Sequence, residues 1–170
     1  MLARALRAAI GLRDKVVVVR LDAATLADPT GIEATAADLA LGRALGVRMI
    51  AICEGRAPKP PGPALRLAAA LERHGAMGVA LPAEGIVTVH AGMPVVNAMV
   101  LVQLCSLGYV PVLYPPVADA AGVVVDLAPE ALAAAVARFT DAARVISTDA
   151  PGQLLADVLL HDPAAPAGPR

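Results

Sequence analysis

Aromatic residues are almost absent from this 170-residue sequence, which has no Trp, one Phe and two Tyr. Because hydrophobic residues still make up 58% of the chain, its core must be built mainly from Ala, Val and Leu. An excess of charge of one sign is also lacking, since 14 Lys and Arg stand against 15 Asp and Glu. Such a balance gives no electrostatic footprint for nucleic acid or an acidic membrane surface. We therefore expect neither as a partner.

Long hydrophobic runs are missing too. A membrane-spanning helix needs roughly 18 uninterrupted apolar residues, and the longest candidates are broken by Pro111, Pro115 and Asp126. The N-terminus has no long apolar core of the kind found in secretory signals. Cysteine is scarce, and Cys53 and Cys105 both lie in apolar stretches. This placement is typical of unreactive core thiols in a protein from a reducing compartment. Together these features predict a cytoplasmic protein.

Short apolar segments alternate with Ala-rich helical segments along most of the chain. The stretch at 108–115 is typical, because a Gly suited to end a helix precedes an almost wholly apolar strand. Strands that are apolar on both faces belong in a covered parallel sheet. Strands are predicted at 16–19, 47–53, 77–81, 85–90, 109–114, 123–126 and 144–147, and helices at 1–12, 31–45, 65–73, 94–107, 128–141 and 151–160.

This alternation predicts an α/β fold, in the form of a three-layer αβα sandwich with a mainly parallel sheet and right-handed connections. A chain of this length can bury one sizeable core. We therefore expect a single domain at 1–161, which begins with the helix at 1–12, and a frayed tail at 162–170. Asp28-Pro29-Thr30-Gly31 is predicted to be a turn, with Thr30 as the N-cap of the following helix.

Charged residues follow the first two predicted strands. Arg20 and Asp22 come after the first strand, and Glu54, Gly55 and Arg56 come after the second. Ligands of open α/β sheets bind at the carboxyl ends of the strands, so these residues could form a small polar pocket. In that case the two arginines could hold a carboxylate or phosphate bidentately. The simpler interpretation is that two ion pairs close the mouth of the sheet.

His90, Asp126, Thr148 and Asp149 complete the set of candidate ligand-binding residues. His90 precedes a predicted helix and could equally serve its surface, and Thr148 and Asp149 could cap the last helix ahead of Pro151. The histidines have no partner at metal-ligand spacing. The sequence therefore predicts no catalytic residue, no metal and no cofactor.

Several short sequence motifs occur in an order that is typical of a known protein family. They occur between about Leu6 and Gly152, and the strongest are Gly-Tyr-Val-Pro-Val-Leu at 108–113 and Val-Ile-Ser-Thr-Asp-Ala-Pro-Gly at 145–152, with Arg-His-Gly at 73–75. In these segments the chain resembles the amino acid kinase family, and the N-acetylglutamate kinases within it most closely. The resemblance implies the αβα fold. It also implies phosphate binding on two Gly-rich turns, with two lysines that neutralise the transferred group.

The phosphate-binding motifs of that family are altered here. Arg20 stands at the lysine position, and Asp22-Ala23 replaces the Gly pair that follows. The second Gly-rich turn contains Glu54, with a single Gly, Gly55, after it. A carboxylate at such a turn would repel the phosphate that the turn should hold, because phosphoryl transfer depends on charge stabilisation.

Two further departures concern the rest of the kinase site. The family's Asn-Ala-Asp motif, whose aspartate organises the catalytic lysines, is replaced by Leu-Ala-Pro at 127–129, with Asp126 and Glu130 near but out of register. We also expect most of the nucleotide-binding half to be missing, because the family continues well beyond the segment that ends here at Gly152.

The helix predicted at 94–107 bears on assembly. Members of the resembled family pair through the corresponding helix, and here it has little polar surface. Since a helix that is apolar all round is buried on all sides, we expect a homodimer through 94–107.

The sequence thus favours a degenerate acetylglutamate kinase-like protein without kinase activity, which acts as a small-molecule-binding, regulatory or assembly protein. A small anionic metabolite is one expected ligand. An alternative is a minimal amino acid kinase, an acylamino-acid phosphotransferase whose ATP site comes from a partner chain. A third interpretation, a curtailed product without function, fits poorly with the intact hydrophobic pattern of the strands.

Overall fold

The computed structural model describes residues 11–54 and 62–148. The predicted helix at 151–160, the tail at 162–170 and most of the helix at 1–12 lie outside this part of the chain, as do Gly55, Arg56 and Asp149.

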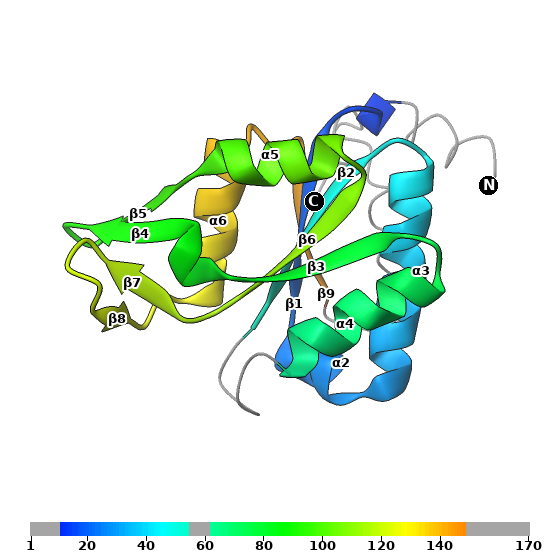
Figure 1. Ribbon diagram of the computed structural model, residues 1–170, viewed down its shortest axis with the longest axis horizontal. Helices are drawn as coiled ribbons and strands as arrows, with labels where there is room; N and C mark the ends of the chain where they lie inside the picture. The colour runs from blue at the N-terminus through cyan, green and yellow to red at the C-terminus, as the bar shows by residue number, and fades with distance from the viewer. Residues whose placement is uncertain (1–10, 55–61, 149–170) are drawn as a thin grey trace, which may run out of the picture.

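A five-stranded parallel sheet forms the centre of the structure (Figure 1). Its strand order is β3-β6-β2-β1-β9, and every neighbouring pair is parallel. Side chains from both faces of the inner strands are buried, as the four consecutive valines of β1 show. The strands are β1 (Val16–Leu21), β2 (Arg48–Cys53), β3 (Met77–Pro82), β6 (Tyr109–Tyr114) and β9 (Arg144–Thr148).

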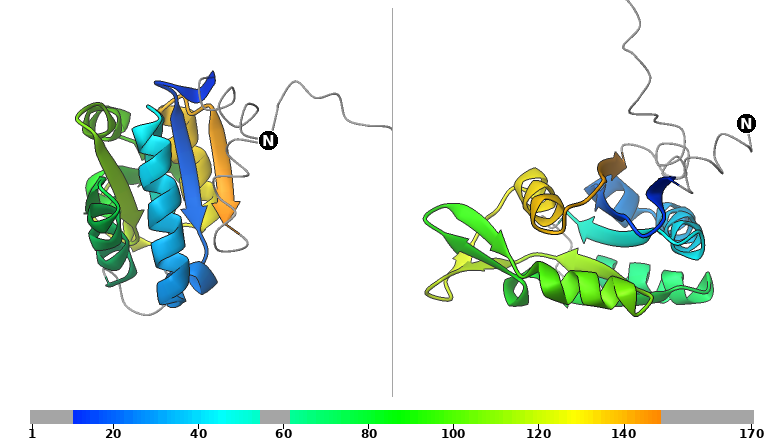
Figure 2. Two further views of the ribbon diagram at one scale, coloured as in Figure 1. Left: turned by 90° about the vertical axis from the view of Figure 1, so that its right-hand side faces the viewer. Right: turned by 90° about the horizontal axis from the view of Figure 1, so that it is seen from above.

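Helices cover both faces of this sheet (Figure 2). The helices α3 (Pro29–Ala44) and α4 (Gly62–Arg73) pack on one face, and α5 (Ala98–Ser106) and α6 (Pro129–Phe139) pack on the other. Alternate β1 residues enter two separate hydrophobic clusters, with Val17 and Val19 on the α3 side and Val16 and Val18 on the α6 side. The predicted αβα sandwich is therefore confirmed.

The chain between β1 and α3 differs from the prediction. A five-residue helix, α2 (Ala23–Ala27), occupies a segment for which no helix was predicted. The helix α3 begins at Pro29 and is capped by Asp28, whose carboxylate accepts hydrogen bonds from the backbone N–H groups of Thr30 and Gly31. Thr30 as the N-cap was therefore wrong, because Pro favours the first helical position and leaves the preceding Asp to cap.

A second, four-stranded sheet with the order β5-β4-β7-β8 projects from one end of the sandwich (Figure 1). Its strands β4 and β7 are parallel, and its outer pairs are antiparallel. The sequence predicted the strands at 85–90 and 123–126 but not a separate sheet. The strands are β4 (Val87–His90), β5 (Met93–Val96), β7 (Val117–Asp119) and β8 (Val124–Val125), and a short 3-10 helix, η1 (Ala83–Gly85), precedes them.

The helix predicted at 94–107 was wrong in its first three residues. They belong to β5, which pairs with β4 through a hairpin in which Ala91 and Gly92 both have positive φ. Val95 and Val96 are β-branched and suit a strand, and Pro94 is tolerated because β5 is an edge strand. The shorter helix α5 then ends where expected, before Gly108 at φ 90°.

Within the described residues, every helix is too short or too polar to cross a membrane.

Gly78 of β3 allows the closest approach between α4 and the sheet. A Cβ atom at this position would lie 2.7 Å from both the backbone Cα and the backbone O of Ala68. We predict that Gly78→Ala lowers the free energy of unfolding by about 1–3 kcal/mol, because backbone atoms cannot move aside as a flexible side chain can. Urea unfolding measures the change.

Gly85→Ala is the matched control, since a Cβ there meets nothing within 4 Å. It should change the free energy of unfolding by less than about 0.5 kcal/mol. Equal effects of the two substitutions would contradict the close approach of α4 to β3.

Candidate functional site

Arg20 lies near the carboxyl end of β1, on the face of the sheet that α6 covers. The alternation of side chains along a strand places it on the same side as Val16 and Val18. In the parallel pairing of β1 with β9, Arg20 stands opposite Ser147. Its Nε donates a hydrogen bond to Ser147 Oγ at 3.1 Å, which fixes the direction of the guanidinium group.

The same guanidinium group joins two glutamates. The Arg20 Nη1 atom donates to Oε1 of Glu54, which follows β2, and to Oε1 of Glu130, in the first turn of α6. The side chains of Arg20 and Glu54 are 16% and 22% exposed, whereas that of Glu130 is 66% exposed. We name Arg20, Glu54 and Glu130 the arginine triad, which carries one positive and two negative charges.

The ion pair expected at the mouth of the sheet is therefore present between Arg20 and Glu54. Asp22 has a different role, because its carboxylate accepts a hydrogen bond of 2.6 Å from the backbone N–H of Thr25 and caps α2. Arg56, the other expected partner, lies outside the described residues.

Glu130 is the triad member that the candidate set omitted. Motif alignment placed it out of register, yet the packing of α6 against β1 brings it to Arg20 across 110 sequence positions. One signal in the sequence pointed to it. Pro129 marks the start of a helix, and an acidic residue in a first helical turn faces the positive end of the helix dipole.

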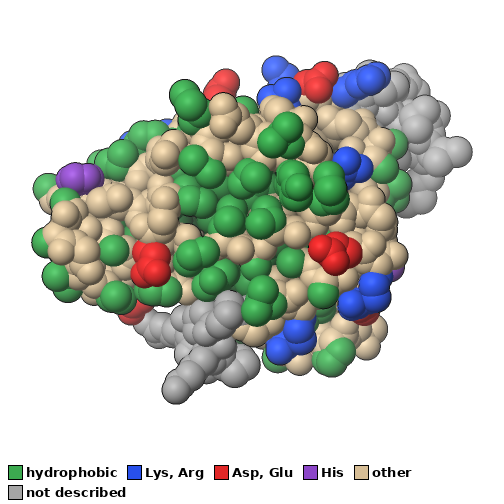
Figure 3. All heavy atoms as spheres, in the orientation of Figure 1, with side chains coloured by type: hydrophobic (Ala, Val, Ile, Leu, Met, Phe, Trp, Pro, Cys, Tyr) green, Lys and Arg blue, Asp and Glu red, His purple; other side chains and the backbone are tan. Residues whose placement is uncertain are grey.

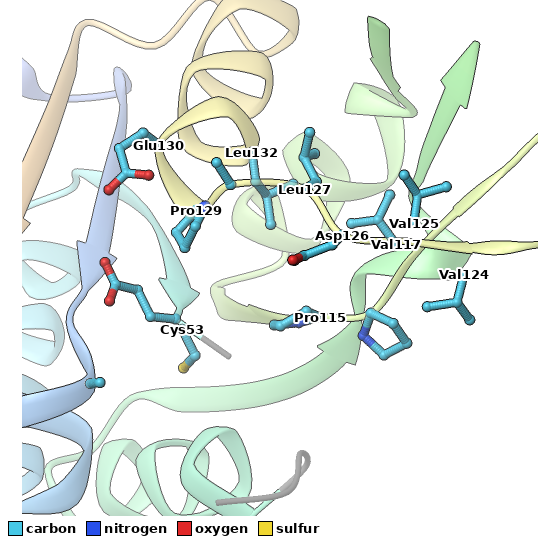
Figure 4. A pocket seen from close by; sticks show the side chains of 14 residues that line it. Cys53, Pro115, Val117, Val124, Val125, Asp126, Leu127, Pro129, Glu130 and Leu132 are labelled. Carbon is cyan, nitrogen blue, oxygen red and sulfur yellow. The ribbon is translucent and has the colours of Figure 1, made fainter. Parts of the chain in front are cut away.

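A cavity of about 830 Å³ lies beside the triad (Figure 4). It is bounded by the end of β2, the segment after β6, the strands β7 and β8 and the start of α6. The described residues that line it combine three carboxylates, a thiol and mostly apolar side chains: Ala23, Cys53, Glu54, Pro115, Pro116, Val117, Val124, Val125, Asp126, Leu127, Ala128, Pro129, Glu130 and Leu132.

Of the other described candidate residues, one lines the cavity and two lie elsewhere. Asp126 lines the cavity, with its carboxylate directed inward between Leu127 and Pro115 (Figure 4). Thr148 is buried at the end of β9, where its Oγ1 donates to the carbonyl oxygen of Arg20 at 3.4 Å. His90 is exposed at the β4–β5 turn and is not among the described residues that line the cavity.

The thiol of Cys53, which lines the cavity, is unreactive. Burial raises the pKa of Cys53 to about 12, and it raises that of Cys105, a buried residue of α5, to about 11. Since the thiolate is the reactive form, neither cysteine is a good nucleophile at neutral pH. In the part of the chain that the structure describes, no group of three His, Cys, Asp or Glu side chains could hold a metal ion.

The site therefore combines a concave, largely apolar surface with an excess of negative charge. Phosphate sites need the opposite, namely backbone N–H groups or cations that face the ligand. The guanidinium group of Arg20, beside the cavity, already donates to Ser147, Glu54 and Glu130. The arrangement suits the binding of an uncharged or cationic small molecule.

We predict that Arg20→Met lowers the free energy of unfolding by about 1–3 kcal/mol, because Glu54 would keep its carboxylate in a poorly hydrated position without a cation. Urea unfolding measures the loss. The matched control is Arg73→Met, which removes an Arg–Glu pair with Glu33 whose side chains are 58% and 45% exposed. This change should cost at most about 1 kcal/mol. Similar losses for both variants would show that the triad is no stronger than a surface ion pair.

No protein-family model matches the sequence, and no curated protein matches it. Solved structures do match. N-acetylglutamate synthase from Neisseria gonorrhoeae, in complex with coenzyme A and N-acetyl-glutamate, is similar with a TM-score of 0.69 and 19% identity over 86% of this chain and 44% of that one. The same synthase in complex with L-arginine matches with a TM-score of 0.62 and 18% identity, over 85% and 46% of the two chains.

Isopentenyl phosphate kinase matches with a TM-score of 0.57 and 12% identity, over 78% of this chain and 70% of that one. The chain spans less than half the length of the two synthase chains. At these identities the similarity establishes the fold alone. The chain has an amino acid kinase-like fold, which matches these structures over part of their length.

Proposed function

We propose that this chain is a non-catalytic protein on an amino acid kinase-like fold, which binds a small molecule in the cavity beside the arginine triad and does not transfer phosphate by itself. Binding would serve a regulatory or assembly role. The observation that carries the proposal is the engagement of Arg20, the residue at the kinase lysine position, by Glu54 and Glu130.

Electrostatics support the loss of phosphotransfer. An ATP phosphate that approached Arg20 would have to displace a carboxylate that already neutralises it, and would meet a second carboxylate beside it. Like charges a few ångströms apart repel by about 1 kcal/mol in water and by more where water is partly excluded. A phosphate loop without its glycines offers fewer backbone N–H groups to the phosphate, and added carboxylates repel it. Both differences weaken the binding of ATP.

The size and position of the cavity support ligand binding. Small-molecule sites commonly enclose about 300–1,000 Å³, and this cavity measures about 830 Å³. It lies at the carboxyl ends of parallel strands, where open α/β sheets bind their ligands.

A second candidate function is a minimal amino acid kinase that works with a partner chain. The ion pair between Arg20 and Glu130 favours it. This pair is similar to the pairing of a lysine with an aspartate in the amino acid kinase family, with Arg in place of Lys and Glu in place of Asp. In that case a partner chain would have to supply the cations and glycine turns of an ATP site.

Nucleotide binding separates the two functions. We predict no increase in melting temperature with Mg-ATP or Mg-ADP, because no free cation faces the cavity from its described wall. A ligand present at 100 times its dissociation constant would stabilise the protein by about 2.7 kcal/mol, which thermal unfolding detects easily. The same assay with N-acetylglutamate, arginine and other amino acids searches for the ligand.

The double variant Glu54→Gln, Glu130→Gln is the control for the electrostatic reason. It frees Arg20 without changing side-chain size, and weak stabilisation by ATP or inorganic phosphate should then appear. Stabilisation of the unchanged protein by Mg-ATP, or phosphorylation of an acylamino acid by it, would contradict the proposal.

We further propose that two copies of the chain associate through the face formed by α5 and β3. Hydrophobic side chains gather at the centre of this face with charged groups around them (Figure 3). Met99 is 70% exposed, Leu107 is 69% exposed and Met77 is 43% exposed, and β3 is an edge strand of the central sheet. A contiguous apolar face of this kind is typical of an interface.

We predict that the protein sediments as a dimer at micromolar concentration and that Met99→Glu makes it monomeric, because the new carboxylate would lose its water in the interface. Leu41→Glu, at an exposed position of α3, is the matched control and should leave the dimer intact. Analytical ultracentrifugation measures both. A monomeric unchanged protein would rule out this assembly.

A further inference from the structure

We infer that the cavity beside the arginine triad takes an organic cation with an apolar body, such as a primary amine or a guanidinium compound. This inference rests on the proposed function, because it names the ligand class of the same cavity. It differs from the small anionic metabolite that the sequence suggested as one ligand.

The first argument is the charge of the cavity wall. Its described lining includes the carboxylates of Glu54, Asp126 and Glu130 but no Lys or Arg side chain. Arg20 contributes one positive charge beside the cavity against the two negative charges of its partners. An anion would therefore enter a net negative field, whereas a cation would be attracted by it.

The second argument is acceptor capacity. Glu54 and Glu130 each accept from Arg20 through Oε1, and a carboxylate has two oxygens with about four lone-pair positions. Each group can therefore accept a further hydrogen bond from an ammonium or guanidinium donor while it keeps its bond to Arg20. A cationic ligand would complete the triad with a second positive charge, so its binding would not require the ion pairs to break.

The third argument is the separation of polar and apolar walls. Glu130 and Cys53 lie at one end of the cavity, Val117, Val124 and Val125 lie at the other, and the Asp126 carboxylate lies between the two ends (Figure 4). Val124 is 65% exposed, so an apolar body placed against β7 and β8 would remove this side chain from water. The geometry fits a ligand with its charge directed to α6 and its apolar part against the small sheet.

The chemistry of the lining also favours an organic cation over a metal ion. No three potential ligands converge among the residues that the structure describes, whereas a bound Ca²⁺ or Mg²⁺ is held by about six or more oxygens. An ammonium group needs only about three acceptors.

The test uses the whole chain and three matched sets of probes. Each set presents one apolar body as an amine, an alcohol and a carboxylate: hexylamine, hexanol and hexanoate; cyclohexylmethylamine, cyclohexylmethanol and cyclohexanecarboxylate; benzylamine, benzyl alcohol and benzoate. Binding is followed by amide chemical-shift changes in ¹H–¹⁵N spectra, which also locate the site. We expect the amine of a set to bind about tenfold or more tightly than its carboxylate, with changes at Glu54, Leu127 and Leu132.

Glu130→Gln should weaken amine binding about tenfold and leave the alcohol unaffected. Glu130 is largely exposed, so this change leaves the fold intact. Glu84→Gln, at an exposed glutamate of η1 outside the cavity lining, is the matched control and should change neither affinity. Amine affinity should also fall as salt concentration rises.

Equal or tighter binding of the carboxylates within the cavity would overturn this inference and leave the proposed small-molecule site standing. Amine binding that Glu130→Gln does not weaken, or that maps outside the cavity, would also overturn it. If no probe of any charge causes shifts at the cavity, the proposed binding function falls and this inference falls with it.

Discussion

The guanidinium group of Arg20 connects three elements that are far apart in the sequence. It contacts Ser147 in β9, Glu54 after β2 and Glu130 in α6, so it fixes the start of a helix over the carboxyl edge of the central sheet. This position decides the character of the site beside it. Because the two glutamates outnumber the arginine, the triad brings a net negative charge to the edge of the cavity between α6, the sheet edge and the small sheet. Apart from Asp126, the other described walls are mainly apolar, because Pro, Val and Leu side chains lie on the strands β7 and β8 and the loops around them.

The scaffold and the chemistry of this protein follow different constraints. The sandwich depends on apolar strands and small residues, such as Gly78 where α4 lies against β3. The same architecture recurs in an N-acetylglutamate synthase and an isopentenyl phosphate kinase at identities below 20%. The chemistry depends on a few side chains at the strand ends. There the identity of a side chain can change what binds without disturbing the core, because these positions lie at the edge of the sheet.

Several elements could be predicted because their signals are local. The strands β1, β2 and β6 are apolar on both faces, and a Gly with positive φ follows α3 and α5, at Gly46 and Gly108. The N-terminal end of α5 could not be predicted, since an apolar run that starts with Pro94 is compatible with either a helix or an edge strand. Pairing with β4 decided in favour of the strand. Likewise, Asp28 before α3 and Pro29 at its first position carried the capping signal, but helix propensity alone did not locate α2.

The sequence by itself determined the layered architecture and the two strand ends that carry Arg20 and Glu54, because hydrophobic pattern and chain order fix which residues leave the core at the edge of a parallel sheet. Only the tertiary structure decided that Glu130 completes the triad, that Asp22 caps a helix, and that a second sheet closes the cavity. These outcomes depend on how α6 and the small sheet pack. Packing joins residues more than 100 positions apart, and no local pattern records which of them will meet.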